Sequence, residues 1–280
     1  MRSLPTPYWQ SPCGSHVLYC ADSRRLAHLF HVDVVITSPP YNCGKDYGLH
    51  NDNMPIDEYV EFLRETVFAA DSCRFVVNIG QYVGSRGNRQ LSRDLLALAA
   101  RALPLVDEVI WDKGPANGAA WGNYPTSPRI RAQHESVFVF GDATMPNGNG
   151  LTWPEWSRLT TSIWRVSPLV DLSIHPAMMP EEIAIRCVSL WSDTKGTILD
   201  PFAGSGTTAV AAIHTGRKSI SIERESKYCA IAKQRMEYAI GVGTLFDPQT
   251  IGLFDDAASG PVPGHALTSE AATRLSRRDG

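Results

Sequence analysis

The run Ser38-Pro39-Pro40-Tyr41 has the residue types and spacing to bind an amino group, and it directly follows the apolar stretch Asp33–Thr37. Two consecutive prolines stiffen the backbone and leave their carbonyls without local donors. A rigid outward carbonyl and the Ser38 hydroxyl can then accept both N–H bonds of an exocyclic amine and aim its lone pair at an electrophile. Tyr41 offers a flat face for stacking a base taken out of a duplex. The alternative is that the two prolines merely end a strand.

A second run, Thr197–Thr208 (TILDPFAGSGTT), predicts a strand, a tight glycine turn and the start of a helix. Gly204 and Gly206 let the backbone approach a ligand closely, and the helix offers free N–H groups. Glu223 ends the next strand, where a carboxylate can accept hydrogen bonds from both hydroxyls of a ribose. The pattern predicts a cofactor that contains a nucleoside. The turn alone also fits nicotinamide oxidoreductases, whereas a phosphate-binding P-loop is excluded because no lysine follows the glycines.

The segments that must position these residues alternate between strands and helices. Seven apolar runs rich in β-branched residues predict buried strands: His16–Cys20, Asp33–Thr37, Arg74–Ile79, Glu108–Trp111, Ser136–Phe140, Thr197–Leu199 and Ser219–Ile222. Helical spacing after Pro55 and after Pro180, and the run Ala209–His214, predict helices between them. Such alternation indicates an α/β protein with a mostly parallel sheet, whose carboxyl edge carries the loop after Thr37 and binds ligands.

Two regions fall outside this alternation. Gly141–Ile174 is polar and loop-like, although three tryptophans are embedded in it. Beyond Asp255 the chain is rich in Ala, Ser, Gly and Pro, which predicts disorder. We therefore expect a single domain over residues 1–254, with an insertion at about 141–174, and a disordered tail over residues 255–280.

Composition narrows the class of protein. The 280 residues suffice for one sizeable α/β domain, and the net charge of −3 neither indicates nor excludes a nucleic-acid partner. Six cysteines without a CxxC pair argue against a zinc site and a disulfide framework, so we expect reduced thiols, no metal and a cytoplasmic location. No stretch reaches the ~20 apolar residues of a membrane span. Met1–Gln10 lacks the apolar region of a secretory signal.

Together the two runs resemble motif IV and motif I of the amino-group DNA methyltransferases. Their order resembles the β class, a circular permutation in which the catalytic loop precedes the cofactor turn. Three further stretches resemble family elements: Tyr19–Asp22 (YCAD), His175–Glu181 (HPAMMPE) and Ile220–Tyr228 (ISIERESKY). The resemblance implies a Rossmann-like fold with a seven-stranded, mostly parallel sheet that has one antiparallel strand near its edge.

The same resemblance implies that the cofactor is S-adenosyl-L-methionine. Its site would be formed by Asp22, Asp200, Phe202, Gly204, Gly206, Thr207 and Glu223. Because Gly206 would let the chain close around the cofactor, we expect Gly206→Val to abolish binding while the fold survives.

The implied reaction is direct in-line methyl transfer to the amine of a base flipped out of double-stranded DNA, without a covalent intermediate. Family members with Ser before the Pro-Pro-Tyr run mostly modify N4 of cytosine, so Ser38 favours cytosine, with N6 of adenine as the alternative. An RNA or protein amino methyltransferase and an inactive DNA-binding regulator are more remote alternatives. A C5-cytosine enzyme is disfavoured because Cys13 lies before the first strand. The resemblance also allows a homodimer and a cognate restriction endonuclease as partners.

Basic residues in two loop regions are candidates for contacts with DNA. We expect the polar loop Asn42–Pro55 to order over the flipped nucleotide, and the segment Gly141–Ile174, helped by Asn123–Arg131, to read the sequence. Arginines in such a segment can contact guanine edges, and lysines can contact phosphates. The candidates are Lys45, Arg129, Arg131, Arg158 and Arg165.

Overall fold

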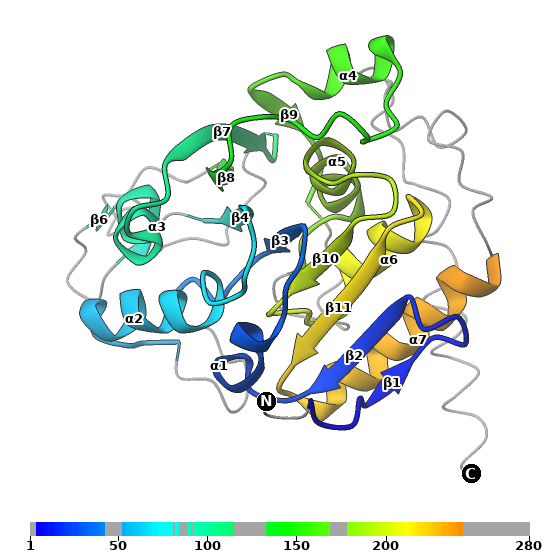
Figure 1. Ribbon diagram of the computed structural model, residues 1–280. Helices are drawn as coiled ribbons and strands as arrows, with labels where there is room; N and C mark the ends of the chain where they lie inside the picture. Colours follow the sequence, from blue (N-terminus) through cyan, green and yellow to red (C-terminus); the bar gives the residue numbers. More distant parts are fainter. Residues whose placement is uncertain are drawn as a thin grey trace.

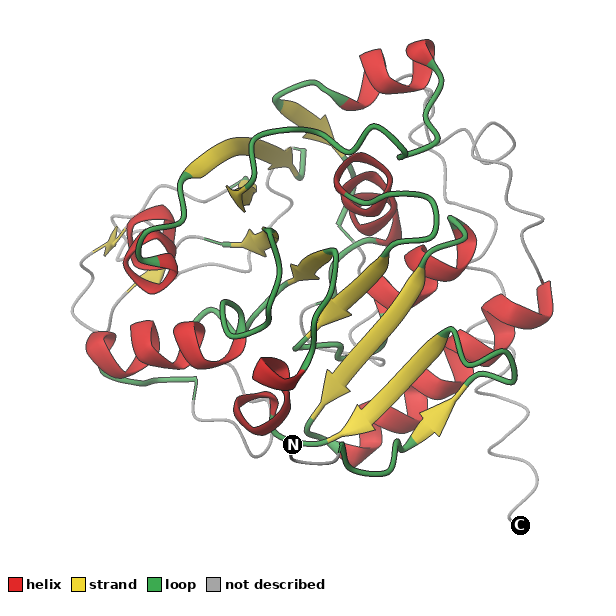
Figure 2. Ribbon diagram, in the orientation of Figure 1, coloured by secondary structure: helices red, strands yellow, loops and turns green. Residues whose placement is uncertain are grey.

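The computed structural model describes residues 4–42, 52–80, 82–83, 89–90, 92–114, 133–168 and 178–242. Its strands are β1 (Trp9–Gln10), β2 (His16–Cys20), β3 (Val34–Thr37), β4 (Arg74–Ile79), β5 (Tyr82–Val83), β6 (Arg89–Gln90), β7 (Leu105–Asp112), β8 (His134–Gly141), β9 (Ile163–Arg165), β10 (Thr197–Asp200) and β11 (Lys218–Glu223). Its helices are α1 (Ser23–Leu26), the 3-10 helix η1 (Ala27–Leu29), α2 (Ile56–Thr66), α3 (Ser92–Ala100), α4 (Trp153–Leu159), α5 (Glu181–Trp191), α6 (Thr207–His214) and α7 (Ser226–Val242). Figures 1 and 2 show how they are arranged.

Within the described ranges, nine strands form one sheet in the order β1-β2-β11-β10-β3-β4-β8-β7-β9, and β5 pairs with β6 apart from it. All seven predicted strands are present, but the predicted number of strands was wrong by two. β1 pairs antiparallel with β2 at one end of the sheet, and β9 pairs parallel with β7 at the other. Strands of two or three residues are too short for their side-chain alternation to show in a sequence.

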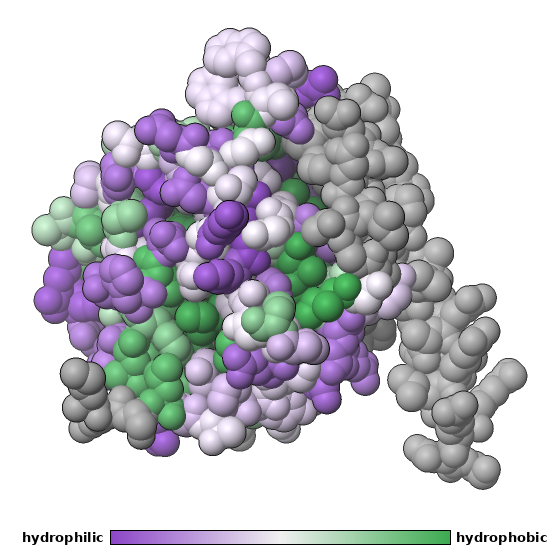
Figure 3. Space-filling model, turned by 45° about the vertical axis from the view of Figure 1, so that its right-hand side comes forward, coloured by the Kyte–Doolittle hydropathy of each residue, from purple (hydrophilic) through white to green (hydrophobic). Residues whose placement is uncertain are grey.

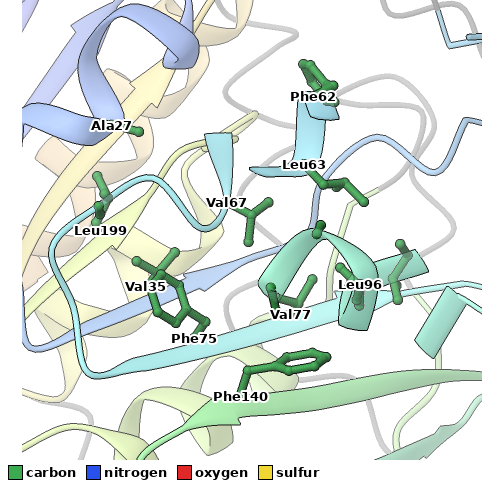
Figure 4. Close-up of a cluster of buried hydrophobic side chains, with 14 of the residues drawn as sticks. Ala27, Val35, Phe62, Leu63, Val67, Phe75, Val77, Leu96, Phe140 and Leu199 are labelled. Atoms are coloured by element: carbon green, nitrogen blue, oxygen red, sulfur yellow. The ribbon is translucent and has the colours of Figure 1, made fainter. Parts of the chain in front are cut away.

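Helices cover both faces of the sheet because alternate side chains of its central strands point to opposite sides. On one face these strands pack against α1, α2 and α3 through Val35, Phe75, Val77 and Leu199 (Figure 4). On the other face they pack against α5 through Val34, Ile36, Val76 and Ile198. The second layer continues with α6, which packs against α7, and α7 covers Leu18 of β2.

The predicted helices are confirmed, with one difference. The face of α2 predicted to be apolar is buried, as shown by Tyr59, Phe62 and Leu63. For α5 the sequence suggests one apolar face, yet every residue of Ile183–Trp191 is buried. Both the sheet and the neighbouring helices α4 and α6 pack against α5, so it has little surface left for solvent.

Within the nine-stranded sheet of the described residues, β1 and β8 run antiparallel to their neighbours. Since β8 lies between β4 and β7 and runs against both, its first residues lie beside the last residues of its neighbours. In this register Ser136 pairs with Ile79 of β4, and Glu135 pairs with Trp111 of β7. The start of β8 therefore lies at the same edge as the carboxyl ends of the parallel strands.

The segment Gly141–Ile174 was predicted to be loop-like, and this prediction was wrong for two of its parts. It contains α4, and it contains β9, which extends the sheet. Trp164 explains why β9 joins the sheet: it is fully buried, with its ring centroid 5.9 Å from that of Trp191. Trp153 is 74% exposed and stacks on Trp156, so these two are not core residues in the way Trp164 is.

Several predictions from the sequence lie outside the described residues. They include the disordered tail and its boundary at residue 254, most of the loop Asn42–Pro55, and the stretch Asn123–Arg131. In the part of the chain that the structure describes, no helix is long and apolar enough to span a membrane. Polar residues are spread over the face drawn in Figure 3, between smaller apolar areas.

Candidate active site

The candidate catalytic loop and the glycine turn leave the sheet from neighbouring strands. β3 pairs parallel with β10, with Val35 opposite Leu199, so the residues after both strands emerge at the same edge. The Oγ1 of Thr37 donates to the Oδ1 of Asp200 at 2.6 Å, and Asp200 also accepts from the backbone N–H of Phe202 at 3.0 Å. This buried carboxyl therefore joins the residue before Ser38 to the first part of the glycine turn.

Burial raises the pKa of the Asp200 carboxyl above its ordinary value, and the hydroxyls of Thr208 and Thr37 partly counteract the rise. Asp200 is only 5% exposed. The sequence predicted Asp200 as a cofactor-binding residue. The structure places it beneath the turn, where it holds both loops.

The glycine turn has the backbone conformation that only glycine adopts readily. Gly204 has φ 51° and Gly206 has φ 83°, both in the left-handed region. A Cβ atom on Gly206 would lie 3.0 Å from the Cβ and 3.2 Å from the Cα of Ala232 in α7. Gly206 thus permits a close approach to a helix of this chain, so we expect Gly206→Val to strain the fold as well as to affect the cofactor site.

Glu223 lies at the end of β11, next to the turn. Its Oε2 accepts from the backbone N–H of Gly204 at 2.9 Å, and its Oε1 accepts from that of Glu225 at 2.7 Å. Burial raises the pKa of Glu223 above its usual value, and these backbone N–H groups oppose the rise. A carboxylate has about four lone-pair sites, so Glu223 still has acceptor capacity for two hydroxyls.

The other predicted cofactor residues surround the turn. The carboxylate of Asp22 caps α1 and pairs with Arg24 at 2.7 Å. Phe202 is half-buried and contacts Phe62 of α2, with ring centroids 5.5 Å apart. The Oγ1 of Thr207 accepts from Arg235 of α7 at 3.1 Å. The contact of Asp22 fixes the start of α1, whereas those of Phe202 and Thr207 link the turn to α2 and α7. Direct roles in cofactor binding stay predictions for all three.

The catalytic loop is held by residues on both sides of it. The hydroxyl of Tyr59 in α2 donates to the carbonyl of Pro40 at 2.7 Å. Asn42 has the unusual φ of 54°, and its backbone N–H donates to the buried Asp52 at 2.7 Å. Its side-chain oxygen accepts from the N–H of Met54 at 2.6 Å. The loop thus turns sharply after Tyr41 and is anchored to the segment before α2.

A cluster of polar side chains, which the sequence analysis missed, lies against Tyr41. The Tyr41 hydroxyl lies 3.0 Å from the Oγ of Ser38 and donates to the Oε2 of Glu135 at 2.8 Å. Asn78 Nδ2 donates to both the Tyr41 hydroxyl and Glu135 Oε2, at 3.2 and 3.0 Å. Lys113 Nζ forms an ion pair with Glu135 Oε1. We call Asn78, Lys113 and Glu135 the polar cluster.

A sequence signal for the polar cluster existed. Asn78 interrupts the apolar run RFVVNI, Lys113 follows the predicted strand Glu108–Trp111, and Glu135 precedes Ser136–Phe140. Polar residues at the ends of strands that share a sheet edge are candidates for one site. Finding them required knowing that the strand beginning near Ser136 is the antiparallel one.

The DNA-binding candidates are only partly described. Lys45, Arg129 and Arg131 lie outside the described residues. Arg165 ends β9, with 79% of its side chain exposed and its Nε 3.5 Å from Oδ2 of Asp112. Because Asp112 ends β7, this places Arg165 at the carboxyl edge of the sheet. Arg158 is exposed on α4.

Comparison with known proteins shows a relationship to DNA methyltransferases. A family model described as DNA methylase, for N6 and N4 methyltransferases, matches residues 32–234. The chain is 27% identical over 264 residues to the type II methyltransferase M.ScaI of Streptomyces caespitosus, covering 84% of this chain and 85% of that protein. It is 25% identical over 231 residues to the DNA adenine methyltransferase YhdJ of Escherichia coli (strain K12), covering 74% and 77%.

Two solved structures share the fold. The cytosine-N4-specific PvuII DNA methyltransferase has a TM-score of 0.62 at 19% identity, covering 84% of this chain and 93% of that one. TTHA0409 from Thermus thermophilus, complexed with S-adenosyl-L-methionine, has a TM-score of 0.60 at 24% identity, covering 80% and 93%.

Proposed function

The chain belongs to the N6/N4 DNA methylase family, and from this premise we propose that it transfers a methyl group to N4 of a cytosine in double-stranded DNA. Membership in the family and the S-adenosylmethionine-dependent methyltransferase fold, both predicted from the sequence, are confirmed. The chain is a DNA amino-methyltransferase whose cofactor is S-adenosyl-L-methionine. The choice between cytosine and adenine, and the roles of individual residues, are the proposal.

The observation that supports the roles proposed for the two loops is the bond between Thr37 and Asp200. It ties the loop able to accept an amine to the turn able to hold a nucleoside, on two neighbouring strands of one sheet. Two reactants held in a fixed geometry react as if they were parts of one molecule. This can raise the reaction rate by several orders of magnitude over that of the same groups free in solution. The arrangement therefore suits a reaction in which the enzyme contributes position more than covalent chemistry.

The residues present fit the cofactor. The left-handed backbone at Gly204 lets the chain approach a ligand closely, the N-terminus of α6 offers backbone donors, and Glu223 has acceptor capacity for the ribose hydroxyls. Asp22, Phe202 and Thr207 are proposed to complete this site. When bound, the cofactor supplies an electrophilic methyl group on a positively charged sulfur.

The catalytic loop binds and orients the amine. An aromatic amine is a poor nucleophile because its lone pair is conjugated into the ring. Hydrogen bonds from the amine to the Ser38 hydroxyl and to the Pro39 carbonyl favour a tetrahedral nitrogen with an available lone pair. Tyr59 already donates to the carbonyl of Pro40, which supports Pro39 as the second acceptor. Tyr41 supplies the surface against which the flipped base rests.

Ser38 supports cytosine as the target, as does the fold shared with the cytosine-N4-specific PvuII enzyme. The similarity to YhdJ, a DNA adenine methyltransferase, keeps N6 of adenine as the second candidate. Lys45, Arg129, Arg131, Arg158 and Arg165 are proposed to contact the DNA. A homodimer and a cognate endonuclease stay predictions.

The base is identified by its product. Plasmid DNA incubated with the purified chain and isotopically labelled S-adenosylmethionine is digested to nucleosides and analysed by mass spectrometry. We expect N4-methylcytosine and no N6-methyladenine. Label found only in N6-methyladenine would overturn the assignment to cytosine and leave the family's reaction in place.

A further inference from the structure

We propose that Glu135 is a positioning residue that fixes the Ser38 hydroxyl as a hydrogen-bond acceptor for the substrate amine. The inference rests on the proposed amino methylation and deepens it, because it names a residue outside the Ser38–Tyr41 run. Glu135 lies at the start of β8, on the edge from which the catalytic loop emerges, and only 12% of its side chain is exposed.

The direction of the hydrogen bonds follows from the chemistry of the groups. A carboxylate accepts hydrogen bonds and donates none, so the Tyr41 hydroxyl directs its one proton to Oε2 of Glu135, 2.8 Å away. The Oγ of Ser38 lies 3.0 Å from the same Tyr41 oxygen. Because the tyrosine proton is already engaged, Ser38 must be the donor in this contact. The Ser38 oxygen then has only lone pairs to offer on its other side.

This orientation is the productive one for an amine. An exocyclic amine presents two N–H donors, and its own lone pair must stay free for the methyl group. A serine hydroxyl that turned its proton toward the amine would compete for that lone pair. Without the carboxylate, Tyr41 could instead donate to Ser38, and one Ser38 lone pair would be occupied. Glu135 thus excludes the wrong orientation of two hydroxyl groups.

The other two members of the polar cluster hold Glu135 in place. Lys113 Nζ forms an ion pair with Oε1, and Asn78 Nδ2 donates to Oε2 at 3.0 Å. Lys113 itself lies over the ring of Trp111 at 4.6 Å from the centroid, and its backbone N–H donates to the carbonyl of Gln133. The carboxylate is therefore held by a side chain of β4 and by the residue after β7, two partners that lie outside the catalytic loop.

The test measures whether Glu135 acts through Ser38. Single-turnover methyl transfer to duplex DNA is measured for the wild type, Glu135→Gln, Ser38→Ala and the double variant. In Glu135→Gln the amide oxygen faces Lys113, and the NH2 group then faces the Tyr41 hydroxyl, which loses its acceptor. We expect this variant to lower the rate constant by about tenfold to a hundredfold, as for the loss of a hydrogen bond to a charged group. In the Ser38→Ala background the same substitution should change the rate by less than about twofold, because the hydroxyl it orients is absent.

A merely structural role is excluded by the binding constants. Cofactor affinity from calorimetry and DNA affinity from fluorescence anisotropy should stay within about twofold of wild type in Glu135→Gln. Tyr41→Phe keeps the ring, breaks the same chain of hydrogen bonds and should show a similar loss of rate, so it tests the inference even if Glu135→Gln misfolds. The control is Glu108→Gln on the exposed surface of β7, where Glu108 accepts a hydrogen bond from Ser136, and it should keep the wild-type rate.

Equal losses from Glu135→Gln with and without the Ser38 hydroxyl would overturn the inference, as would an unchanged rate in both Glu135→Gln and Tyr41→Phe. The proposed function fails in a different way. If the wild type transfers no methyl group to an amine in DNA, the proposed function is wrong and the inference falls with it.

Discussion

Glu223 combines two properties that affect cofactor binding. It is largely buried, which raises the pKa of its carboxyl above the ordinary 4.5, and it lies beside the turn that is proposed to hold the nucleoside. The charge on Asp200 contributes to the rise in the pKa of Glu223. A raised pKa means that, as the pH falls, Glu223 gains a proton earlier than an exposed glutamate would. The protonated form is a poorer acceptor for ribose hydroxyls.

Cofactor affinity should therefore depend on pH through Glu223. We expect wild-type affinity to weaken as the pH falls through the raised pKa, and to be constant well above it. Glu223→Gln should bind the cofactor more weakly by about 1.5–3 kcal/mol at neutral pH and lose this pH dependence. Calorimetry from neutral to mildly acidic pH measures both, and Glu237→Gln on α7 is the control with wild-type behaviour. An unchanged pH profile in Glu223→Gln would show that another group titrates.

Arg165 is a described candidate for a contact with DNA, since its exposed side chain lies at the carboxyl edge. We expect Arg165→Ala to weaken DNA binding and, if Arg165 contacts a phosphate, to reduce the slope of log affinity against log salt by about 0.9. Anisotropy titrations over a range of salt concentrations measure this. Lys218→Ala, at the opposite edge where β11 begins, is the control that should leave the slope unchanged. Identical slopes in both variants and the wild type would exclude a phosphate contact.

At the scale of elements, the packing of α6 against α7 depends on the absence of a side chain at Gly206. Gly206 and Gly216 both have φ in the left-handed region, 83° and 73°. A Cβ at Gly206 would meet Ala232, whereas a Cβ at Gly216 would meet nothing within 4 Å. Substitutions at these two glycines therefore distinguish the cost of backbone strain, which both share, from the cost of a steric clash, which only Gly206 has.

We expect Gly216→Ala to lower the free energy of unfolding by about 1–2 kcal/mol, the usual cost of a left-handed residue with a Cβ. Gly206→Ala should lose about 1–3 kcal/mol more, because α7 must also shift. Urea unfolding of both variants gives the difference directly. Equal losses would mean that α7 accommodates the methyl group freely.

The hydrogen bond between Thr37 and Asp200 links β3 to the glycine turn. Thr37→Val keeps the shape of the side chain and leaves a buried carboxyl short of one donor. We expect a loss of about 1–3 kcal/mol in the free energy of unfolding. Thr66→Val is the matched control, since Thr66 is equally buried but binds only within α2 to the carbonyl of Phe62. If the control loses as much as Thr37→Val, the bond has no special role.

Sequence patterns predicted the elements better than the contacts between them. Buried strands such as Arg74–Ile79 were found because their apolar runs are long enough to be distinctive. β9 was missed because three residues carry no such pattern, and its burial depends on Trp191 from a distant helix. The sequence indicated that the backbone at Gly206 approaches another group closely. It did not indicate that this group is Ala232, which lies in a different helix.

In the site, too, residues in local patterns were predicted and the contacts between distant segments were not. Ser38–Tyr41 and Glu223 could be predicted as site residues because each lies in a distinctive local pattern. Glu135 could not, since its relation to Tyr41 depends on the register of an antiparallel strand between two parallel ones. Asp200 was predicted as a cofactor residue, but its link to Thr37 spans strands far apart in the sequence.

At the scale of the whole molecule, the order of strands brings two distant parts of the chain together. β3 and β10 are far apart in sequence and adjacent in the sheet, so the catalytic loop and the cofactor turn meet at one edge although the loop comes first. β4, β8 and the end of β7 then add the polar cluster on the far side of Tyr41. The central claim is that this edge is a single centre for methyl transfer to an amine in DNA.

The most direct test offers the purified chain duplex DNA, RNA and protein together, with S-adenosylmethionine labelled in its methyl group. The label is counted in each polymer and then located within the labelled nucleosides. Ser38→Ala run in parallel should bind the cofactor normally and transfer much less. We expect label on an exocyclic nitrogen of DNA bases, foremost N4 of cytosine. Label at carbon 5 of cytosine, or in RNA or protein with none in DNA, would contradict it.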